Sequence, residues 1–199
     1  MKTLISTVFK GDVVKMATYR LSPDKLILFD SKEYKHTDVS DKGVSELRKA
    51  FSGLPVEIER RYTKMYDIVA IASDVISCID AEHKLGNEVM LHISEGRKTQ
   101  FIGMLMAAYA RKEKVSGVYY LVEETKDVLT LPLLSLVPSK AKLLILKEIA
   151  KGNKSVTDIV KKLGKTKGIV YIQIKELRAD GYIKKEDLEL TEAGRVSVK

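Results

Sequence analysis

The 199-residue sequence contains one cysteine, Cys78, and three scattered histidines, His36, His83 and His92. A single cysteine excludes an internal disulfide and any zinc site built from several thiolates. The histidines show no spacing typical of metal ligands. We therefore expect neither a metal nor another cofactor.

Long apolar runs are missing as well. No stretch reaches the roughly 20 apolar residues that a membrane-spanning helix requires, and residues 1–9 lack the successive zones of a signal peptide. We expect a cytoplasmic protein without a membrane partner. Apolar residues make up 45% and charged residues 31% of the chain, which is typical of a globular protein, and the length allows two small domains.

The glycine-rich signatures of nucleotide enzymes are also absent. The sequence contains neither a GxGxxG fingerprint nor a Walker A motif, in which glycines let the backbone approach a phosphate closely. This argues against NAD binding and against ATP hydrolysis.

The net charge of +8 is unevenly distributed. Residues 1–135 contain 20 basic and 19 acidic side chains, whereas residues 136–199 contain 15 basic and 8 acidic ones. A basic excess confined to one small region is typical of nucleic-acid binding, because each neutralised phosphate releases counterions. A solvated lysine-rich surface explains the charge equally well, so charge alone does not decide between the two.

The first two thirds of the chain alternate between segments that favour strands and segments that favour helices. This pattern predicts an α/β fold of the Rossmann-like type, with a mainly parallel sheet and helices on both faces. Right-handed crossovers favour a strand order near 3-2-1-4-5, with a crevice between the carboxyl ends of strands 1 and 4. The predicted strands are residues 2–9, 25–29, 56–62, 88–93 and 117–122, and the predicted helices are residues 13–21, 41–51, 66–85 and 97–114.

We interpret residues 1–127 as one domain and residues 140–199 as a second, small α+β domain. The intervening residues 128–139 are apolar and contain Pro132 and Pro138. Since proline disfavours a continuous helix or strand, this segment is expected to be a connector.

The second domain contains a helix-turn-helix pattern. Ser139 is expected to cap a first helix, residues 155–163 form a second one closed by Gly164, and Thr166 begins a third. A tip at residues 184–187, between two short strands within residues 182–190, is the predicted wing. The predicted DNA contacts are Lys165, Thr166, Lys167, Gly168, Tyr171, Lys175, Lys184 and Lys185. A winged helix that serves dimerisation or protein contact is the alternative.

Two loops of the first domain are expected to bind a phosphorylated ligand. The loop HISEGRKTQ, residues 92–100, combines Gly96 with a basic pair at the start of a helix, where backbone amides favour anions. The loop STVFKGD, residues 6–12, is predicted to face it across the crevice. The alternative is ordinary helix capping by Ser94. The candidate ligand residues are Thr7, Phe9, Lys10, Gly11, Asp12, Ser94, Glu95, Gly96, Arg97, Lys98 and Thr99.

Three segments carry a resemblance to known families. Residues 163–183 (LGKTKGIVYIQIKELRADGYI) and 190–195 (LTEAGR) resemble winged-helix regulators of the MarR or ArsR kind. Residues 93–110 (ISEGRKTQFIGMLMAAYA) resemble the fourth-strand loop and helix of CARF domains. Together they resemble the archaeal CARF and winged-helix regulators of CRISPR loci. In that family the loop commonly has two glycines before a basic pair, and this sequence departs from the pattern with Glu95 in place of one glycine.

That resemblance implies a homodimer that binds a cyclic oligoadenylate, most often cyclic tetra-adenylate, across its two-fold axis and regulates promoters of CRISPR-Cas genes in antiviral defence. A second function stays open, a metal-independent ring nuclease in which Lys98 stabilises charge and Ser6 or Thr7 positions the ligand. A ribonuclease of the HEPN type is set aside, because no histidine follows Ser139.

Overall fold

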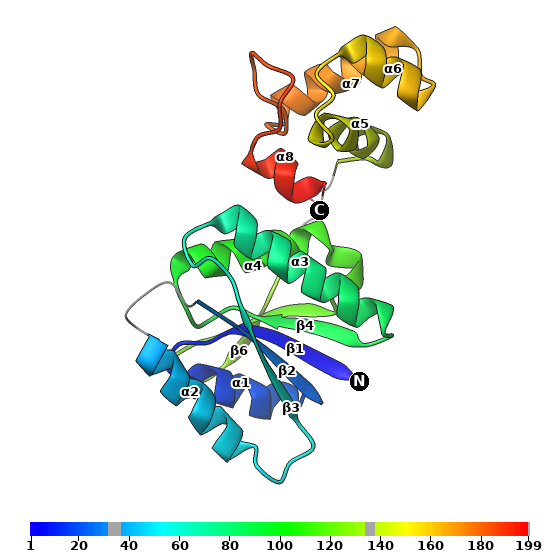
Figure 1. The fold of residues 1–199 in the computed structure, drawn as a ribbon. Helices are drawn as coiled ribbons and strands as arrows, with labels where there is room; N and C mark the ends of the chain where they lie inside the picture. The colour runs from blue at the N-terminus through cyan, green and yellow to red at the C-terminus, as the bar shows by residue number, and fades with distance from the viewer. Residues whose placement is uncertain (32–36, 134–137, 199) are drawn as a thin grey trace. The chain divides into compact units, whose positions relative to one another are not determined.

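The computed structural model describes residues 1–31, 37–133 and 138–198. The chain separates into two compact units, residues 1–135 and 136–199 (Figure 1). Each unit is described by itself.

Unit 1 is built on a six-stranded sheet in the order β3-β2-β1-β4-β5-β6. The first five strands are parallel, and β6 pairs antiparallel with β5. The mainly parallel sheet and the order 3-2-1-4-5 are therefore confirmed, with one additional strand. The strands are β1 (Lys2–Thr7), β2 (Lys25–Asp30), β3 (Glu57–Tyr62), β4 (Glu88–His92), β5 (Gly117–Leu121) and β6 (Val128–Leu131).

Helices cover both faces of this sheet. On one face lie α1 (Asp12–Leu21) and α2 (Thr37–Ala50), and on the other lie α3 (Ile68–Lys84) and α4 (Lys98–Ala110) (Figure 1). A short 3-10 helix, η1 (Lys112–Lys114), follows α4. The core under α1 and α2 contains Leu4, Val8, Val14, Leu26, Leu28, Val44, Leu47, Phe51 and Met90.

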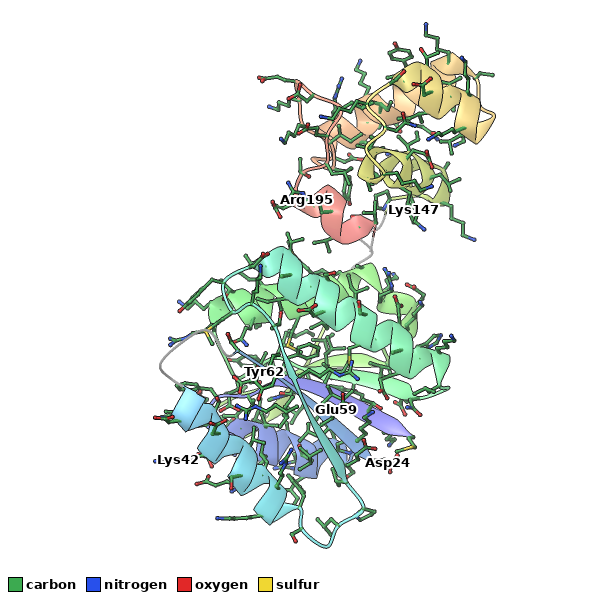
Figure 2. All side chains as sticks on the ribbon, in the orientation of Figure 1. Asp24, Lys42, Glu59, Tyr62, Lys147 and Arg195 are labelled. Atoms are coloured by element: carbon green, nitrogen blue, oxygen red, sulfur yellow. The ribbon has the colours of Figure 1, made fainter. Side chains whose placement is uncertain are left out.

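The amphipathic pattern of α2 sets its orientation. Val44 and Leu47 are buried, whereas Lys42 lies on the outer side of the helix, away from the sheet (Figure 2). Burial of the apolar stripe against the strands therefore places α2 next to the loop that follows β1.

The connector expected at residues 128–139 needs a correction. Val128–Leu131 forms β6, whose ladder with β5 runs from Val118↔Leu131 to Leu121↔Val128. A β-branched and apolar segment next to an open sheet edge gains more by pairing than by remaining irregular, and Pro132 stands just after the strand, where no ladder donor is needed. Residues 134–137 of the expected connector lie outside the described residues.

Unit 2 contains α5 (Lys140–Ala150), α6 (Val156–Leu163), α7 (Lys167–Ala179) and α8 (Glu192–Ser197). The hydroxyl of Ser155 accepts a hydrogen bond from Asp158 N, and Gly164 ends α6 with a φ of 61°. The expected helix-turn-helix is thus present. Its core contains Ile145, Leu146, Ile149, Ile159, Val170, Ile174, Leu177, Ile183 and Leu190.

The predicted wing differs from expectation. Within residues 182–190, one antiparallel bridge, Ile183↔Leu190, stands where two short strands were predicted. Two backbone hydrogen bonds make this bridge, from Lys184 N to Glu189 O at 2.9 Å and from Thr191 N to Tyr182 O at 3.1 Å. The short segment α8 follows, with Thr191 Oγ1 accepting from Gly194 N at 3.2 Å.

Of the helices within residues 1–31, 37–133 and 138–198, none combines the length and the apolar character that crossing a bilayer requires.

Candidate functional site

The loops after β1 and β4 lie side by side at the carboxyl edge of the sheet. The two strands are parallel neighbours, and Ser6 is paired with His92 just before the loops begin. The hydroxyl of Thr7 donates a hydrogen bond to the backbone carbonyl of Glu95. This bond joins the last residue of β1 to the loop of residues 93–97.

The side chain of Glu95 crosses to the other loop. Its Oε1 accepts hydrogen bonds from Lys10 N at 2.6 Å and from Gly11 N at 2.8 Å. The residue is only 9% exposed. Burial raises the pKa of the Glu95 carboxyl above its ordinary value, and backbone hydrogen bonds from the loop of residues 8–11 oppose that rise.

Gly96 is required by its surroundings. Its φ is +92°, and a Cβ atom there would lie 2.7 Å from Gln100 Oε1 and 3.0 Å from Thr7 Oγ1. Gln100 Oε1 itself accepts from Arg97 N at 2.8 Å and satisfies one amide at the start of α4. A side chain at position 96 would therefore separate the two loops.

Sequence reasoning missed Gly43 in α2. A Cβ atom there would lie 2.8 Å from the backbone oxygens of Phe9 and Lys10. Because a glycine inside a helix costs about 1 kcal/mol relative to alanine, its presence in an otherwise regular helix was the available signal of a close backbone approach.

The basic groups of this site face solvent. Lys10, Arg97 and Lys98 are exposed, together with Gly96. The Arg97 guanidinium lies over the ring of Phe9, with 5.9 Å between Cζ and the ring centroid. Three cations, the first amides of α4 and an exposed glycine make this edge suitable for an anion.

The candidate hydroxyl groups already have protein partners. Ser94 Oγ accepts from Leu121 N, and Thr99 Oγ1 donates to Met65 O at 2.6 Å. Ser6 is fully buried and pairs with His92 Nδ1 at 2.9 Å. Thr7 is 1% exposed. Among Ser6, Thr7 and Lys98, only Lys98 is therefore exposed to a ligand.

His92 lies under this edge of the sheet. It is fully buried, and burial lowers its pKa to about 4. It is therefore a neutral core histidine at pH 7.

In unit 2, α7 presents an exposed face that carries four of the eight predicted DNA contacts. Lys167, Gly168, Tyr171 and Lys175 are exposed, and Lys167 Nζ lies 5.8 Å from the centroid of the Tyr171 ring. Thr166, the N-cap residue of α7, is also exposed. Ile172 on the same helix is 60% exposed, so the face combines cations with apolar groups.

Two of the predicted DNA contacts have partners within unit 2. Lys165 Nζ donates to Ala141 O at 3.4 Å and to Gln173 Oε1 at 3.2 Å. Lys184 pairs with Glu189 at 2.8 Å. Hydrogen bonds from Lys154 and Lys184 lower the pKa of Glu189 to about 2. Lys185 is exposed beside them at the tip.

Within the part of the chain that the structure describes, no group of three or more histidine, cysteine, aspartate or glutamate side chains is arranged to hold a metal ion.

Two family models match the chain. The model described as "HFX_2341_N:-like, N-terminal" matches residues 4–126. The model of the arsR family of bacterial regulatory proteins matches residues 139–185. None of the curated proteins compared with the chain matches it.

Solved structures share the fold at low sequence identity. Csm6 of Enterococcus italicus, bound to cyclic hexa-2'-fluoro-hexa-dAMP, is 12% identical with a TM-score of 0.57, covering 94% of this chain and 51% of its own. Can2 of Sulfobacillus thermosulfidooxidans, in complex with cyclic tetra-adenylate, is 12% identical with a TM-score of 0.54, covering 99% of this chain and 64% of its own. Protein VC1899 of Vibrio cholerae is 11% identical with a TM-score of 0.54, over 99% of this chain and 64% of its own.

This chain thus spans between half and two thirds of the length of these proteins. The solved structures confirm the expected Rossmann-like fold, and the arsR-family match agrees with the helix-turn-helix seen in unit 2.

Proposed function

The chain belongs to the family described as "HFX_2341_N:-like, N-terminal", and we propose that it is a DNA-binding transcriptional regulator whose first unit senses a cyclic oligoadenylate. The observation that carries the proposal is the exposed face of α7 in a basic unit similar to arsR-family regulators.

The DNA-binding part rests on charge and geometry. Residues 136–199 contain 15 basic and 8 acidic side chains, and Lys167, Tyr171 and Lys175 share the exposed face of the second helix of the helix-turn-helix. A helix of this kind enters the major groove, with lysines on phosphates. We propose promoters of CRISPR-Cas genes as its natural sites.

The ligand part rests on the edge formed by the loops after β1 and β4. Lys10, Arg97 and Lys98 are exposed there beside the amides at the start of α4. The solved structures of Csm6 and Can2, which share the fold, contain bound cyclic oligoadenylate compounds. We propose cyclic tetra-adenylate as the ligand of this chain, with Arg97 and Lys98 neutralising its phosphates.

We propose a homodimer as the active form. Ile102 and Met106 are one helical turn apart on α4 and are 40% and 37% exposed. An apolar stripe beside the ligand edge suits a second copy, which would bring two identical loops to one symmetric ligand.

Fluorescence anisotropy tests whether the protein binds promoter DNA and whether a ligand changes that binding. The protein is titrated into labelled DNA from the promoter of its own locus and into random duplex, at several salt concentrations, with and without cyclic tri-, tetra- and hexa-adenylate. We expect a salt-dependent preference for the promoter that one of the three ligands changes. Equal affinity for both DNAs at every salt concentration would contradict the proposal.

The double variant Arg97→Ala/Lys98→Ala tests whether ligand binding belongs to unit 1 and DNA binding to unit 2. We expect it to lose cyclic tetra-adenylate binding by at least tenfold and to keep its affinity for DNA. Lys112→Ala, an exposed lysine of η1 in the same unit, is the matched control and keeps both. Loss of DNA binding in the double variant would show that unit 1 contributes to DNA binding. It would contradict the assignment of DNA binding to unit 2.

Ring cleavage is tested with the same material. Ser6 and Thr7 are buried and hydrogen-bonded, so we expect labelled cyclic tetra-adenylate to remain intact after hours with the protein in EDTA. Linear products on a chromatogram would restore the ring-nuclease alternative.

A further inference from the structure

Two successive backbone amides of the loop after β1 point at one anionic oxygen. Lys10 N and Gly11 N donate to Glu95 Oε1 at 2.6 and 2.8 Å. Gly11 has a φ of 90° and precedes α1, a helix of 10 residues. Successive amides around a left-handed residue at a helix start form a nest that binds phosphates and other anions. We call Lys10 N and Gly11 N the amide nest.

Glu95 is an unusual occupant of such a nest. The residue is only 9% exposed, and its second oxygen, Oε2, has no hydrogen-bond partner among the residues that the structure describes. Taking a carboxylate out of water and leaving one oxygen unpaired is costly. Burial accordingly raises the pKa of the Glu95 carboxyl. A side chain serving only to cap α1 would not require this cost.

The surroundings of the nest are those of an anion site. Three exposed cations belong to the loops after β1 and β4 and to the start of α4, namely Lys10, Arg97 and Lys98. One exposed carboxylate, Asp12 at the start of α1, opposes them. Glu95 stands between the nest and the basic pair, directly before Gly96, whose φ is +92°. Its negative charge occupies the amides that would otherwise bind the anion attracted by these cations.

We propose that Glu95 is an internal anion that closes the amide nest, and that a phosphate group of the ligand binds Lys10 N and Gly11 N only when it displaces the Glu95 carboxylate. This inference rests on the proposed function in one respect, namely that the phosphate group comes from a cyclic oligoadenylate. The nest itself binds an anionic oxygen, such as one of a phosphate group. Glu95 therefore lowers the affinity of this edge and sets the ligand concentration to which the protein responds.

Two variants of Glu95 distinguish the effect of its negative charge on phosphate binding from the effect of its size. Glu95→Gln keeps the size and one acceptor oxygen without the charge, and Glu95→Ala empties the nest. Both are titrated with inorganic phosphate, with the amide signals of Lys10 and Gly11 followed by NMR. We expect these amides to respond to phosphate at concentrations at least tenfold lower in Glu95→Ala than in the unaltered protein, with Glu95→Gln between them.

The matched control is Glu113→Ala, which removes an exposed carboxylate from η1 in the same unit and leaves the phosphate response unchanged. If Lys10 and Gly11 do not respond to phosphate in folded Glu95→Ala, the inference is wrong. If Glu95→Ala does not fold, Glu95→Gln decides, and a phosphate response no stronger than that of the unaltered protein overturns the inference.

A parallel titration with cyclic tetra-adenylate distinguishes this inference from the proposed function. Phosphate binding strengthened in Glu95→Ala, with no cyclic oligoadenylate bound by any form, supports the closed nest and removes the proposed ligand. Cyclic tetra-adenylate bound equally by all forms, with the Lys10 and Gly11 amides unchanged, supports the ligand and overturns the role of Glu95.

Discussion

Gly43 of α2 and Gly11 of the loop after β1 are in direct backbone contact. A Cβ atom at Gly11 would lie 2.9 Å from the carbonyl oxygen of Gly43. This contact presses the loop that carries the amide nest against a rigid helix. The position of Lys10 N and Gly11 N therefore depends on a helix 32 residues further along the chain.

Gly43→Ala is expected to destabilise unit 1. Alanine normally stabilises a helix by up to about 1 kcal/mol relative to glycine, but here the added Cβ would lie 2.8 Å from the backbone of Phe9 and Lys10. Overpacking of this kind costs about 1–3 kcal/mol. Urea unfolding measures the loss of free energy of unfolding, and the anion response at Lys10 should weaken with it.

The control for this variant is Gly168→Ala in α7, where a Cβ atom meets nothing within 4 Å. We expect it to leave stability unchanged or to raise it by up to about 1 kcal/mol. A gain of stability in Gly43→Ala would show that the loop moves away without cost.

His92 makes the stability of the protein depend on pH. Its pKa is lowered to about 4 in the folded protein because it is buried, whereas an unfolded histidine titrates near 6.5. Between these values the unfolded chain binds more protons, so stability falls as pH falls. We expect a loss of about 2 kcal/mol between pH 7 and pH 5 from this group, measured by urea unfolding at each pH.

His92→Asn should reduce that pH dependence, whereas His83→Asn, which changes an exposed histidine at the end of α3, should retain it. Comparing the two removes the contribution of the carboxyl groups. Identical pH dependence in both variants would contradict the burial of a neutral His92.

Lys167 and Lys175 are expected to bind DNA phosphates. The variant Lys167→Gln/Lys175→Gln should bind promoter DNA at least tenfold more weakly. The slope of log affinity against log salt should fall by about 0.9 for each lysine. Lys147→Gln, on α5 (Figure 2), is the control that removes one exposed lysine of the same unit outside α7. A slope unchanged in the double variant would count against DNA binding by α7.

Thr7→Val tests the bond between the end of β1 and the loop of residues 93–97. Valine keeps the shape of threonine but cannot donate to the carbonyl of Glu95, and a buried hydrogen bond contributes about 1 kcal/mol. We expect a lower melting temperature and faster hydrogen exchange in residues 93–97. Thr18→Val is the control, because that hydroxyl donates to Val14 O within its own helix. Equal effects of both variants would deny a special role to the Thr7 bond.

The architecture was predictable from local patterns. Alternating apolar runs and helical stripes such as Val170, Ile174 and Leu177 indicated where strands and helices lie, because the two periods differ. Right-handed crossovers then limited the strand order. The basic loop at Arg97 and Lys98 was found in the same way, since these residues follow a strand and begin a helix.

The groups that control the site were decided by tertiary contacts. Glu95 is 85 residues from Lys10, and Lys165 is 24 residues from Ala141, so neither partner follows from local periodicity. The pairing of β6 and the close approach of Gly43 likewise required the assembled sheet. Sequence alone determined the first five strands, the helices between them and the helix-turn-helix, and where cations gather. Only the folded chain decided which of those polar groups are already bound, because hydrogen bonds and burial depend on neighbours that are remote in sequence.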